Sequence, residues 1–269
     1  RIGVDAIVVF QDILTPLAPL GAEFVFRPGP VLRTPMVSER DVERWSPYDP
    51  SEQLGFVGET FRILHRALAG ELPLLGFAGA PLTLAFFLLE GKSPGRNPER
   101  ARALMREDPA AFHRLLERLA AVTAEYLLYQ IESGADAVQL FESLADVLTP
   151  DEYETFAHPY HVKIFSKLKG RVPTILFAKE QPLLELMASS GADVLSIGTC
   201  VDLAEAKRRV GDHVALQGNV DNRLIVDASF EAIDEAVGAC IHAGAHQGHI
   251  LNLSHGLLPD TPFENVCRF

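Results

Sequence analysis

The chain alternates short apolar runs, rich in β-branched and aromatic residues, with longer segments in which apolar residues recur every three or four positions. This alternation is typical of repeated strand–helix units, which form a parallel sheet covered by helices. Helical periodicity is clearest over residues 61–68, 112–133, 201–210 and 230–243. The apolar runs predict seven strands, at residues 4–9, 72–77, 135–141, 173–177, 193–197, 214–217 and 249–253.

A short motif marks where helices end and strands begin. Gly134-Ala135-Asp136 and Gly191-Ala192-Asp193 each place a glycine directly before an apolar run, and Gly3-Val4-Asp5 is similar. We therefore expect a helix to end at residue 2, and a further helix to begin within residues 261–266. These patterns predict one domain over residues 1–269, an α/β protein with a (β/α)8 TIM barrel that lacks its first βα unit in this sequence. An open doubly wound sheet is the alternative.

Composition and charge narrow the class of protein. With 269 residues, of which 48% are hydrophobic and 22% charged, the chain can bury the core of one α/β domain. A formal net charge of -12 disfavours nucleic acid and anionic membranes as partners. The sequence shows neither a long uninterrupted apolar stretch nor a signal-peptide pattern, so we expect a cytoplasmic protein.

The cysteines and common motifs exclude several chemistries. Cys200, Cys240 and Cys267 lack CxxC or Cys/His spacing, which indicates a reducing compartment, small apolar filler side chains and no structural zinc site. The sequence contains no GxGxxG, Walker, HExxH or nucleophile-elbow motif. Dinucleotide binding, a phosphate-binding loop and zinc-dependent hydrolysis therefore lack their usual motifs.

Functional residues of such a barrel lie at the carboxyl ends of its strands. The predicted strands deliver Asp12, Gly79-Ala80-Pro81, Glu142-Ser143, Lys179-Glu180, Thr199-Cys200, Gly218-Asn219 and Ser254-His255-Gly256. A carboxylate, a hydroxyl and an imidazole beside small residues predict a polar-lined pocket in a mostly apolar wall.

Asp12 is the most informative of these residues. It follows an apolar run that is interpreted as a buried parallel strand, and more apolar residues come after it. Because a buried carboxylate without a partner is costly, Asp12 is expected to meet a specific donor or ligand. An equally weighted alternative makes it the N-cap of the next helix.

The other strand-end residues also have two interpretations each. Lys179 could form a Schiff base, but pairing with a carboxylate such as Glu180 or Glu142 is favoured. Ser143 has no adjacent base, so a hydrogen bond to a ligand or to the backbone is expected rather than nucleophilic attack. His255 is either a ligand contact or a histidine satisfied by neighbouring backbone.

Five ordered motifs resemble the uroporphyrinogen decarboxylase family, and the resemblance spans essentially all 269 residues. The surroundings of Asp12 are similar to a family strand that ends in Ser-Asp-Ile-Leu. The motifs are Phe77–Leu84 with Glu90-Gly91, Gln139–Ser143, Ile175–Lys179, Leu216–Asp221 and Asn252–Thr261.

The resemblance implies a single barrel, usually a homodimer, that needs no metal or organic cofactor. It implies decarboxylation of the four acetate side chains of uroporphyrinogen III, giving coproporphyrinogen III in haem and chlorophyll biosynthesis. Asp12 matches the family's essential aspartate, a catalytic group that accepts hydrogen bonds from the pyrrole N–H groups. Ser143 and His255 match residues that contact the substrate, and Phe87 stands where the family usually has a substrate-contacting tyrosine.

The sequence also departs from the family pattern. The family's Met-Arg-Gln-Ala-Gly-Arg run, whose arginines bind substrate carboxylates, does not occur in it. Ser254 replaces a glycine beside His255, Ser196–Cys200 replaces the usual Gly-Leu-Asp-Trp-Thr, and Lys179–Pro182 replaces a glycine-rich turn.

Two other functions share this sequence pattern. One is a zinc- or corrinoid-dependent methyltransferase of the same superfamily, although its His-x-Cys and distant cysteine ligands do not occur here. The other is a non-catalytic paralogue that binds a tetrapyrrole.

Overall fold

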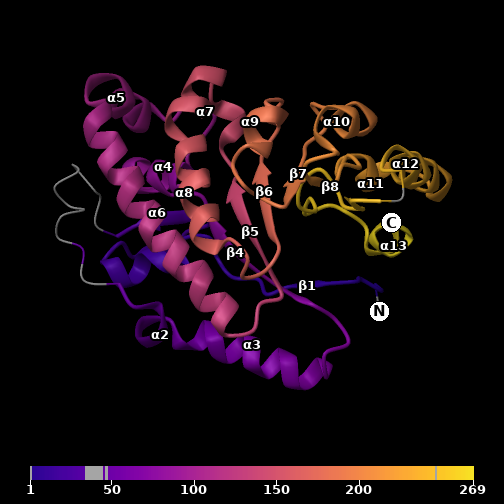
Figure 1. The fold of residues 1–269 in the computed structure, drawn as a ribbon, viewed down its shortest axis with the longest axis horizontal. Helices are drawn as coiled ribbons and strands as arrows, with labels where there is room; N and C mark the ends of the chain where they lie inside the picture. Colours follow the sequence, from indigo (N-terminus) through magenta and orange to yellow (C-terminus); the bar gives the residue numbers. More distant parts are fainter. Residues whose placement is uncertain (1, 34–44, 46–47, 246) are drawn as a thin grey trace.

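A computed structural model describes residues 2–33, 45, 48–245 and 247–269. Within these residues, seven parallel strands form one curved sheet in the order β1-β4-β5-β6-β7-β8-β9 (Figure 1). The strands are β1 (Ile7–Val8), β4 (Leu74–Gly79), β5 (Ala137–Glu142), β6 (Thr174–Ala178), β7 (Val194–Ser196), β8 (Ala215–Gln217) and β9 (His249–Ile250).

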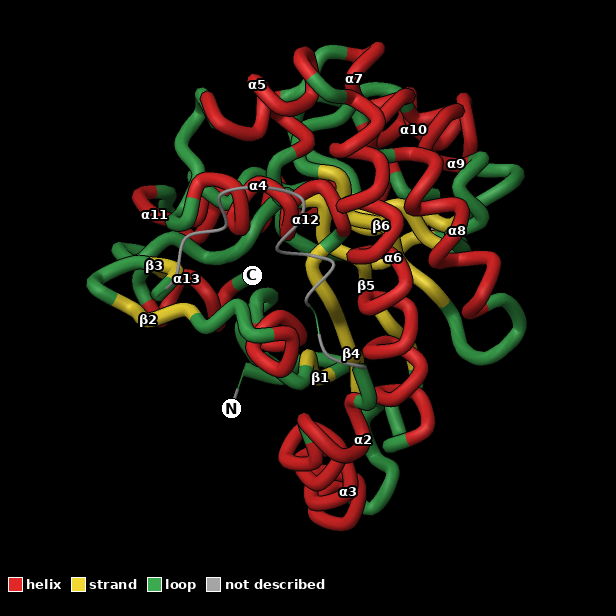
Figure 2. The backbone as a smooth tube through the Cα atoms, turned by 90° about the vertical axis from the view of Figure 1, so that its left-hand side faces the viewer, coloured by secondary structure: helices red, strands yellow, loops and turns green. Residues whose placement is uncertain are grey.

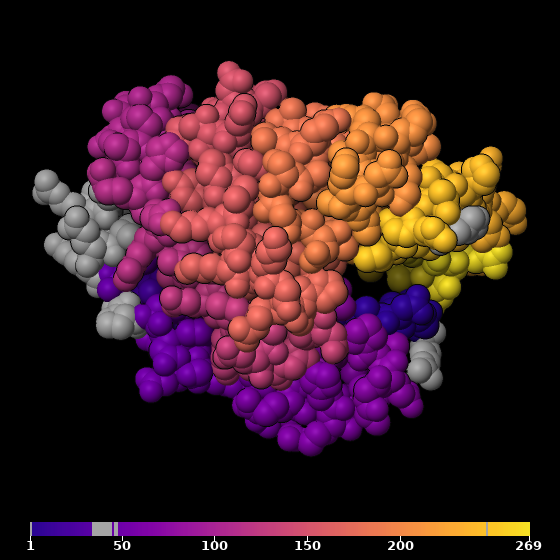
Figure 3. Space-filling view, in the orientation of Figure 1, coloured from indigo at the N-terminus to yellow at the C-terminus, as the bar shows by residue number. Residues whose placement is uncertain are grey.

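The strand order decides between the two predicted architectures. Each parallel strand pairs with the one before it in sequence, so the order does not reverse as it does in a doubly wound sheet. The α/β barrel-type fold is therefore confirmed, and the open doubly wound alternative is wrong. Both termini lie on one side of the molecule, and the surface is hollowed between the N-terminal residues in indigo and the C-terminal residues in yellow (Figure 3). An eighth strand stays a prediction.

The first strand differs from the prediction. Only Ile7–Val8 form a strand, and Val8 and Phe10 are 47% and 86% exposed. In the described chain β1 lies at one end of the sheet and pairs with β4 alone, Ile7 opposite Leu74. The expected buried strand over residues 4–9 is therefore wrong, because a neighbour on one side only leaves half of the run accessible.

Helices follow the strands as the periodicity predicted. α6 packs on β4 and on α8, and α6 and α8 lie on one side of β4, β5 and β6 (Figure 2). An antiparallel hairpin of β2 (Phe24–Phe26) and β3 (Pro30–Leu32) stands apart from the main sheet. The α-helices are α2 (Pro50–Gln53), α3 (Gly55–Leu68), α4 (Pro81–Glu90), α5 (Glu99–Glu107), α6 (Pro109–Glu132), α7 (Pro150–Phe156), α8 (His158–Leu168), α9 (Leu184–Ala188), α10 (Leu203–Val210), α11 (Leu224–Asp227), α12 (Phe230–Ala243) and α13 (Phe263–Arg268).

No helix in the described ranges combines the length and apolar character needed to cross a membrane.

The repeated Gly-Ala-Asp motif fixes strand register. Gly134 adopts a φ of 112°, a left-handed conformation that glycine allows without steric cost. The aspartates then act across the sheet: Asp136 Oδ2 accepts the Leu74 amide at 2.8 Å, and Asp193 Oδ2 accepts the Thr174 amide at 2.8 Å. Each aspartate therefore joins the start of its strand to the start of the preceding one.

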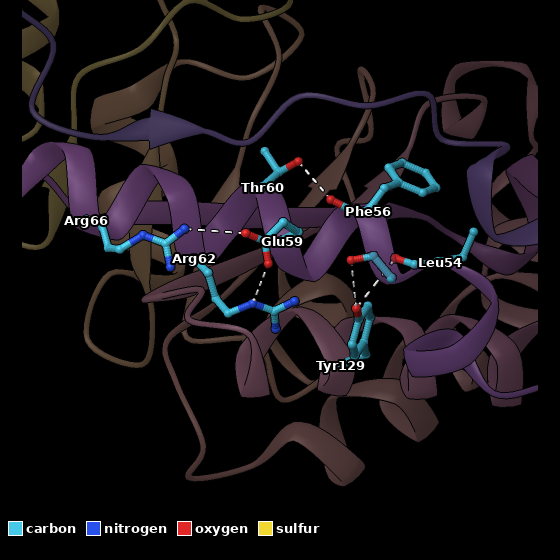
Figure 4. A network of polar contacts seen from close by, with 8 residues as sticks. Leu54, Phe56, Glu59, Thr60, Arg62, Arg66 and Tyr129 are labelled. Atoms are coloured by element: carbon cyan, nitrogen blue, oxygen red, sulfur yellow. Dashed lines mark hydrogen bonds and ion pairs between the residues drawn. The ribbon is translucent and has the colours of Figure 1, made fainter.

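Helix α3 packs closely against α6. The Tyr129 hydroxyl on α6 donates to the carbonyls of Leu54 and Gly55 at 3.5 Å, at the start of α3 (Figure 4). A Cβ at Gly58 would lie 2.4 Å from that hydroxyl, so only glycine permits this approach. On the exposed face, Glu59 pairs with Arg62 at 3.0 Å and with Arg66 at 3.4 Å.

A buried carboxylate joins β5 to two helices. Glu142, at the end of β5, is fully buried, and its Oε1 accepts the Thr83 amide at 2.9 Å and the Thr83 hydroxyl at 2.5 Å. His161 Nε2, on α8, lies 3.0 Å from Oε2. Burial, followed by the charge of Glu142, raises the pKa of the neighbouring Tyr153 far above its usual range. Glu142 is thus a structural residue rather than a strand-end group that faces a ligand.

We predict that Glu142→Gln lowers the free energy of unfolding by about 3 kcal/mol, because it removes one partner of a fully buried, hydrogen-bonded pair. Glu117→Gln is the control, since Glu117 pairs with Lys163 on the exposed surface. It should cost about 1 kcal/mol or less. Urea denaturation of both variants measures the difference, and equal midpoints would contradict the prediction.

Candidate functional site

Aromatic side chains from successive strands wall a cavity of about 370 Å³ at the carboxyl end of the sheet. Phe10 follows β1, Phe77 lies on β4, Phe141 on β5 and Phe177 on β6. Neighbouring rings lie 5.9, 5.5 and 5.5 Å apart, centre to centre, and the His255 ring is 5.7 Å from Phe177. We call this space the apolar cavity.

Polar side chains from the inner strands also line the apolar cavity. Gln217 Nε2 on β8 donates to Ser196 Oγ on β7 at 3.0 Å and to Gln139 Oε1 on β5 at 3.4 Å. All three residues are buried. Sequence reasoning missed them, although a polar side chain inside an otherwise apolar strand was the available signal.

The structure brings the predicted site residues Ser143 and His255 to the same apolar cavity. Phe87 does not line it: the side chain lies on α4, half-buried and packed against the hydrophobic core. The expected substrate contacts of these three residues remain predictions.

Asp12 lies between Phe10 and Ile13, which both line the apolar cavity. It is half-buried, and its Oδ1 accepts the Leu14 amide at 2.8 Å. The following 3-10 helix (Thr15–Leu20) has Leu14 at its N-cap without a side-chain cap, so the N-cap interpretation of Asp12 is wrong. The bond closes a tight turn instead. Asp12 itself does not line the apolar cavity, and its Oδ2 accepts no hydrogen bond from a described residue.

A second cavity, also of about 370 Å³, shares Ser254 and His255 with the first. Six of its lining residues carry charge, so we call it the charged cavity: Arg96, Asp146, Lys179, Glu180, Asp221 and Arg223.

Lys179 pairs with a carboxylate, as predicted, but the partner is different. Its Nζ lies 3.0 Å from Asp146 Oδ2, because Glu142 is buried against Thr83 and His161 and Glu180 points to the neighbouring strand. The expected pairing with Glu180 or Glu142 is therefore wrong.

Glu180 is held in an unusual conformation. Its φ is 47°, a left-handed value that costs a residue with a side chain about 1 kcal/mol or more. Its carboxylate accepts the amides of Thr199 at 3.1 Å and Cys200 at 2.7 Å, both just beyond β7. These bonds tie the end of β6 to the end of β7.

The cysteines divide into two groups. Cys240 is buried, as the prediction of an apolar filler requires, whereas Cys200 and Cys267 are exposed, so that prediction is wrong for those two. Partial burial and the adjacent Glu180 carboxylate raise the pKa of the Cys200 thiol to about 11. Cys200 is therefore a protonated, weakly reactive thiol at neutral pH. In the described ranges, no three His, Cys, Asp or Glu side chains are grouped closely enough to hold a metal ion.

His255 stands where the two cavities meet. Partial burial and then the positive charge of Lys179 lower the pKa of His255, while Asp146 and Glu180 act in the opposite direction. Its Nδ1 accepts the Gly256 amide at 2.8 Å, so the neutral ring carries its proton on Nε2. The backbone thus satisfies one nitrogen, as one sequence interpretation expected. The ring also lines both cavities, and its contact with a ligand stays a prediction.

The family model for uroporphyrinogen decarboxylase (URO-D) matches residues 1–269. The chain belongs to the uroporphyrinogen decarboxylase family. It is 40% identical to uroporphyrinogen decarboxylase of Synechococcus sp. (strain CC9605) and 38% identical to that of Trichodesmium erythraeum (strain IMS101). Each match covers 98% of this chain and 76% of the relative.

Solved structures of other proteins share the fold. A methyltransferase from Methanosarcina mazei superposes with a TM-score of 0.83 at 20% identity, over 98% of this chain and 78% of that one. A B12-independent methionine synthase from Shewanella sp. W3-18-1 gives 0.63 at 12% identity, over 99% and 79%. At these identities the likeness concerns the fold alone.

The Glu180 carboxylate lies directly against Gly198. Gly198 stands where the family pattern described above has aspartate, and Glu180 lies in place of a glycine-rich turn. A Cβ at Gly198 would lie 2.6 Å from the Glu180 carboxyl carbon. The glutamate therefore fills the space that a side chain at position 198 would need.

We predict that Gly198→Ala destabilises the protein by about 1–3 kcal/mol, because the new Cβ collides with the Glu180 carboxylate. In a Glu180→Gly background the same alanine should cost about 1 kcal/mol less, since the obstacle is gone and the two sites are coupled. Thermal unfolding of the four proteins in this double-mutant cycle measures the coupling. Additive effects would show that the two residues are independent.

We predict opposite pKa changes at His255 for two neighbouring variants. Lys179→Met should raise the pKa of His255, because it removes a cation and frees the Asp146 carboxylate. Asp146→Asn should lower it, because Lys179 then acts without its partner. In the parent protein the pKa lies below the ordinary 6.5, so protonation sets in only below about pH 6.5. An NMR titration of the His255 ring measures its pKa in the parent protein and in both variants. If both variants changed this pKa in the same direction, the electrostatic explanation would be contradicted.

Proposed function

We propose that this chain decarboxylates the four acetate side chains of uroporphyrinogen III to methyl groups, giving coproporphyrinogen III in tetrapyrrole biosynthesis. The observation that carries the proposal is membership of the uroporphyrinogen decarboxylase family, with about 40% identity to named decarboxylases over 98% of the chain. The two adjoining cavities suit a substrate with a pyrrole centre and charged arms.

The chemistry needs a proton and an electron sink. Protonation of a pyrrole ring carbon gives a cationic ring, which accepts the electron pair when the bond between the acetate methylene and its carboxylate breaks. Carbon dioxide leaves, the methylene carbon then takes a proton, and the ring proton is lost to restore the pyrrole. Each acetate thus consumes one proton and becomes a methyl group.

Asp12 is proposed to stabilise the cationic ring. Its Oδ1 is fixed by the Leu14 amide, so the carboxylate is oriented before substrate binds, and Oδ2 can accept pyrrole N–H groups. A bound substrate against the aromatic wall would exclude water from the pair, which strengthens the attraction between carboxylate and cation. Ser143 and His255, which line the apolar cavity, are proposed to contact the periphery of the substrate. Phe87 packs against the core instead, so a substrate contact from it gains no support from the geometry.

Family membership also supports two finer proposals. We expect the chain to act in the cytoplasm, as the sequence lacks a signal-peptide pattern, and to form a homodimer, as the family resemblance implied.

A zinc-dependent methyltransferase gains less support from the geometry. Such an enzyme uses a zinc-bound thiolate, whereas Cys200 lies beside a carboxylate that keeps its thiol protonated. Cys240 is buried behind the sheet, and its Sγ lies 3.2 Å from the Gly218 carbonyl. The structural likeness to methyltransferases therefore does not extend to a zinc-binding thiolate.

We predict that Asp12→Asn lowers turnover of uroporphyrinogen about a hundredfold or more, the scale of losing one preoriented electrostatic group. Asparagine keeps an oxygen that can accept the Leu14 amide, so the turn should survive while the charge is lost. Circular dichroism and thermal unfolding check the fold. Products are separated by carboxyl number after anaerobic incubation with uroporphyrinogen III.

The outcomes of this assay separate the candidate functions. Undiminished coproporphyrinogen formation by folded Asp12→Asn protein would refute the role of Asp12. Tight tetrapyrrole binding by the parent protein without any loss of carboxylates would instead favour a non-catalytic paralogue.

A further inference from the structure

We propose that the charged cavity is a binding subsite for carboxylate arms of the substrate, with Arg96 and Arg223 as its anion-binding residues. This inference rests on the proposed function, because it assigns the ligand of the second cavity to the same tetrapyrrole. It supplies this chain with a carboxylate-binding site that its motifs do not predict.

Most charged side chains of the charged cavity already interact with other groups of the protein. Lys179 pairs with Asp146 at 3.0 Å, and the Glu180 carboxylate accepts the amides of Thr199 and Cys200. Asp221 Oδ1 accepts the backbone amide of Arg223 at 2.9 Å. Each carboxylate in the cavity therefore already has a donor inside the protein.

The two arginines differ from these groups. Both line the cavity and are exposed, and neither guanidinium forms an ion pair with a described residue. A guanidinium is permanently charged and can bind a carboxylate through two parallel N–H groups. Arg96 and Arg223 are therefore the cations left for an anionic ligand.

The backbone that carries Arg223 is held firmly. Arg223 precedes α11, and its neighbour Asn222 donates through Nδ2 to the Gly256 carbonyl at 2.7 Å. The Ser254 amide in turn donates to the Val220 carbonyl at 2.7 Å. The segment after β8 is thus joined to the segment that contains His255, and Arg223 and His255 line the same charged cavity.

The loop that carries Arg96 is closed at its base by bonds between α4 and α5. Glu90 Oε1, at the end of α4, accepts the amides of Arg100 at 2.9 Å and Ala101 at 3.1 Å, at the start of α5. From α5, Arg102 pairs with Glu152 at 2.7 Å and donates to the Val147 carbonyl, next to Asp146. These bonds hold the loop against the rim where Lys179 and Asp146 meet.

The shared wall gives the ligand its shape. Ser254 and His255 border both cavities, so a molecule whose pyrrole ring lies against the aromatic wall can extend its arms past His255 toward the arginines. The acetate and propionate groups of a pyrrole are carboxylates that extend from an apolar ring. The chemistry that fits both cavities is therefore a pyrrole that carries carboxylate arms.

The test compares initial rates with uroporphyrinogen III for Arg96→Ala, Arg223→Ala, Arg223→Lys and the double alanine variant. Each alanine should raise KM about three- to tenfold with kcat little changed, since a charge-assisted contact to the substrate periphery is lost. Lysine at position 223 should restore part of the affinity by keeping the charge. Arg208→Ala, on an exposed arginine of α10 that lines neither cavity, is the matched control and should leave KM unchanged.

A fragment experiment separates this inference from the proposed function. A monopyrrole with one acetate and one propionate is titrated into the parent and double alanine proteins by calorimetry, beside its uncharged diester. The diacid should bind the parent protein more tightly than the diester, and the double variant should lose this preference. An active parent enzyme whose double variant keeps KM and diacid preference would overturn the subsite while leaving the decarboxylase intact. No turnover, but arginine-dependent binding of the diacid, would refute the decarboxylase and retain the subsite.

Discussion

The buried carboxylate of Glu142 joins the parts of the molecule on which the site depends. It lies at the end of β5, takes two hydrogen bonds from Thr83 at the start of α4, and faces His161 on α8. A fully buried charge is tolerated only where its partners are fixed, so these three elements must keep their relative positions. Ser143 follows Glu142 directly, and its place at the cavity wall is set by this network.

Two cavities with different chemistry meet at His255. One is walled by phenylalanines that follow or lie on β1, β4, β5 and β6, and the other is lined by charged side chains. This division matches a molecule whose centre is a ring of pyrroles and whose edge is carboxylate. The neutral imidazole between them adds no net charge and presents its Nε2 proton, because Nδ1 is occupied by Gly256.

Glu180 joins the end of β6 to the segment after β7. It adopts a left-handed conformation, which is unfavourable for a residue with a side chain. Its carboxylate lies against Gly198 and binds the backbone amides of Thr199 and Cys200 rather than a basic side chain. The neighbouring Lys179 pairs with Asp146 instead.

Local patterns were sufficient to predict the strand–helix alternation, most strands to within a few residues, the order of the motifs and their family, because these depend on periodicity and on residues close in the chain. It also placed Ser143 and His255 at strand ends, where parallel strands must converge. The fold was needed to show that Val8 and Phe10, in the run before Asp12, are exposed, that Glu142 is buried, and that Lys179 pairs with Asp146. It also brought Arg96 and Arg223, 127 positions apart in the numbering, to one cavity. Ion pairing and side-chain burial depend on which residues come together in the fold, and a local sequence pattern does not contain that information.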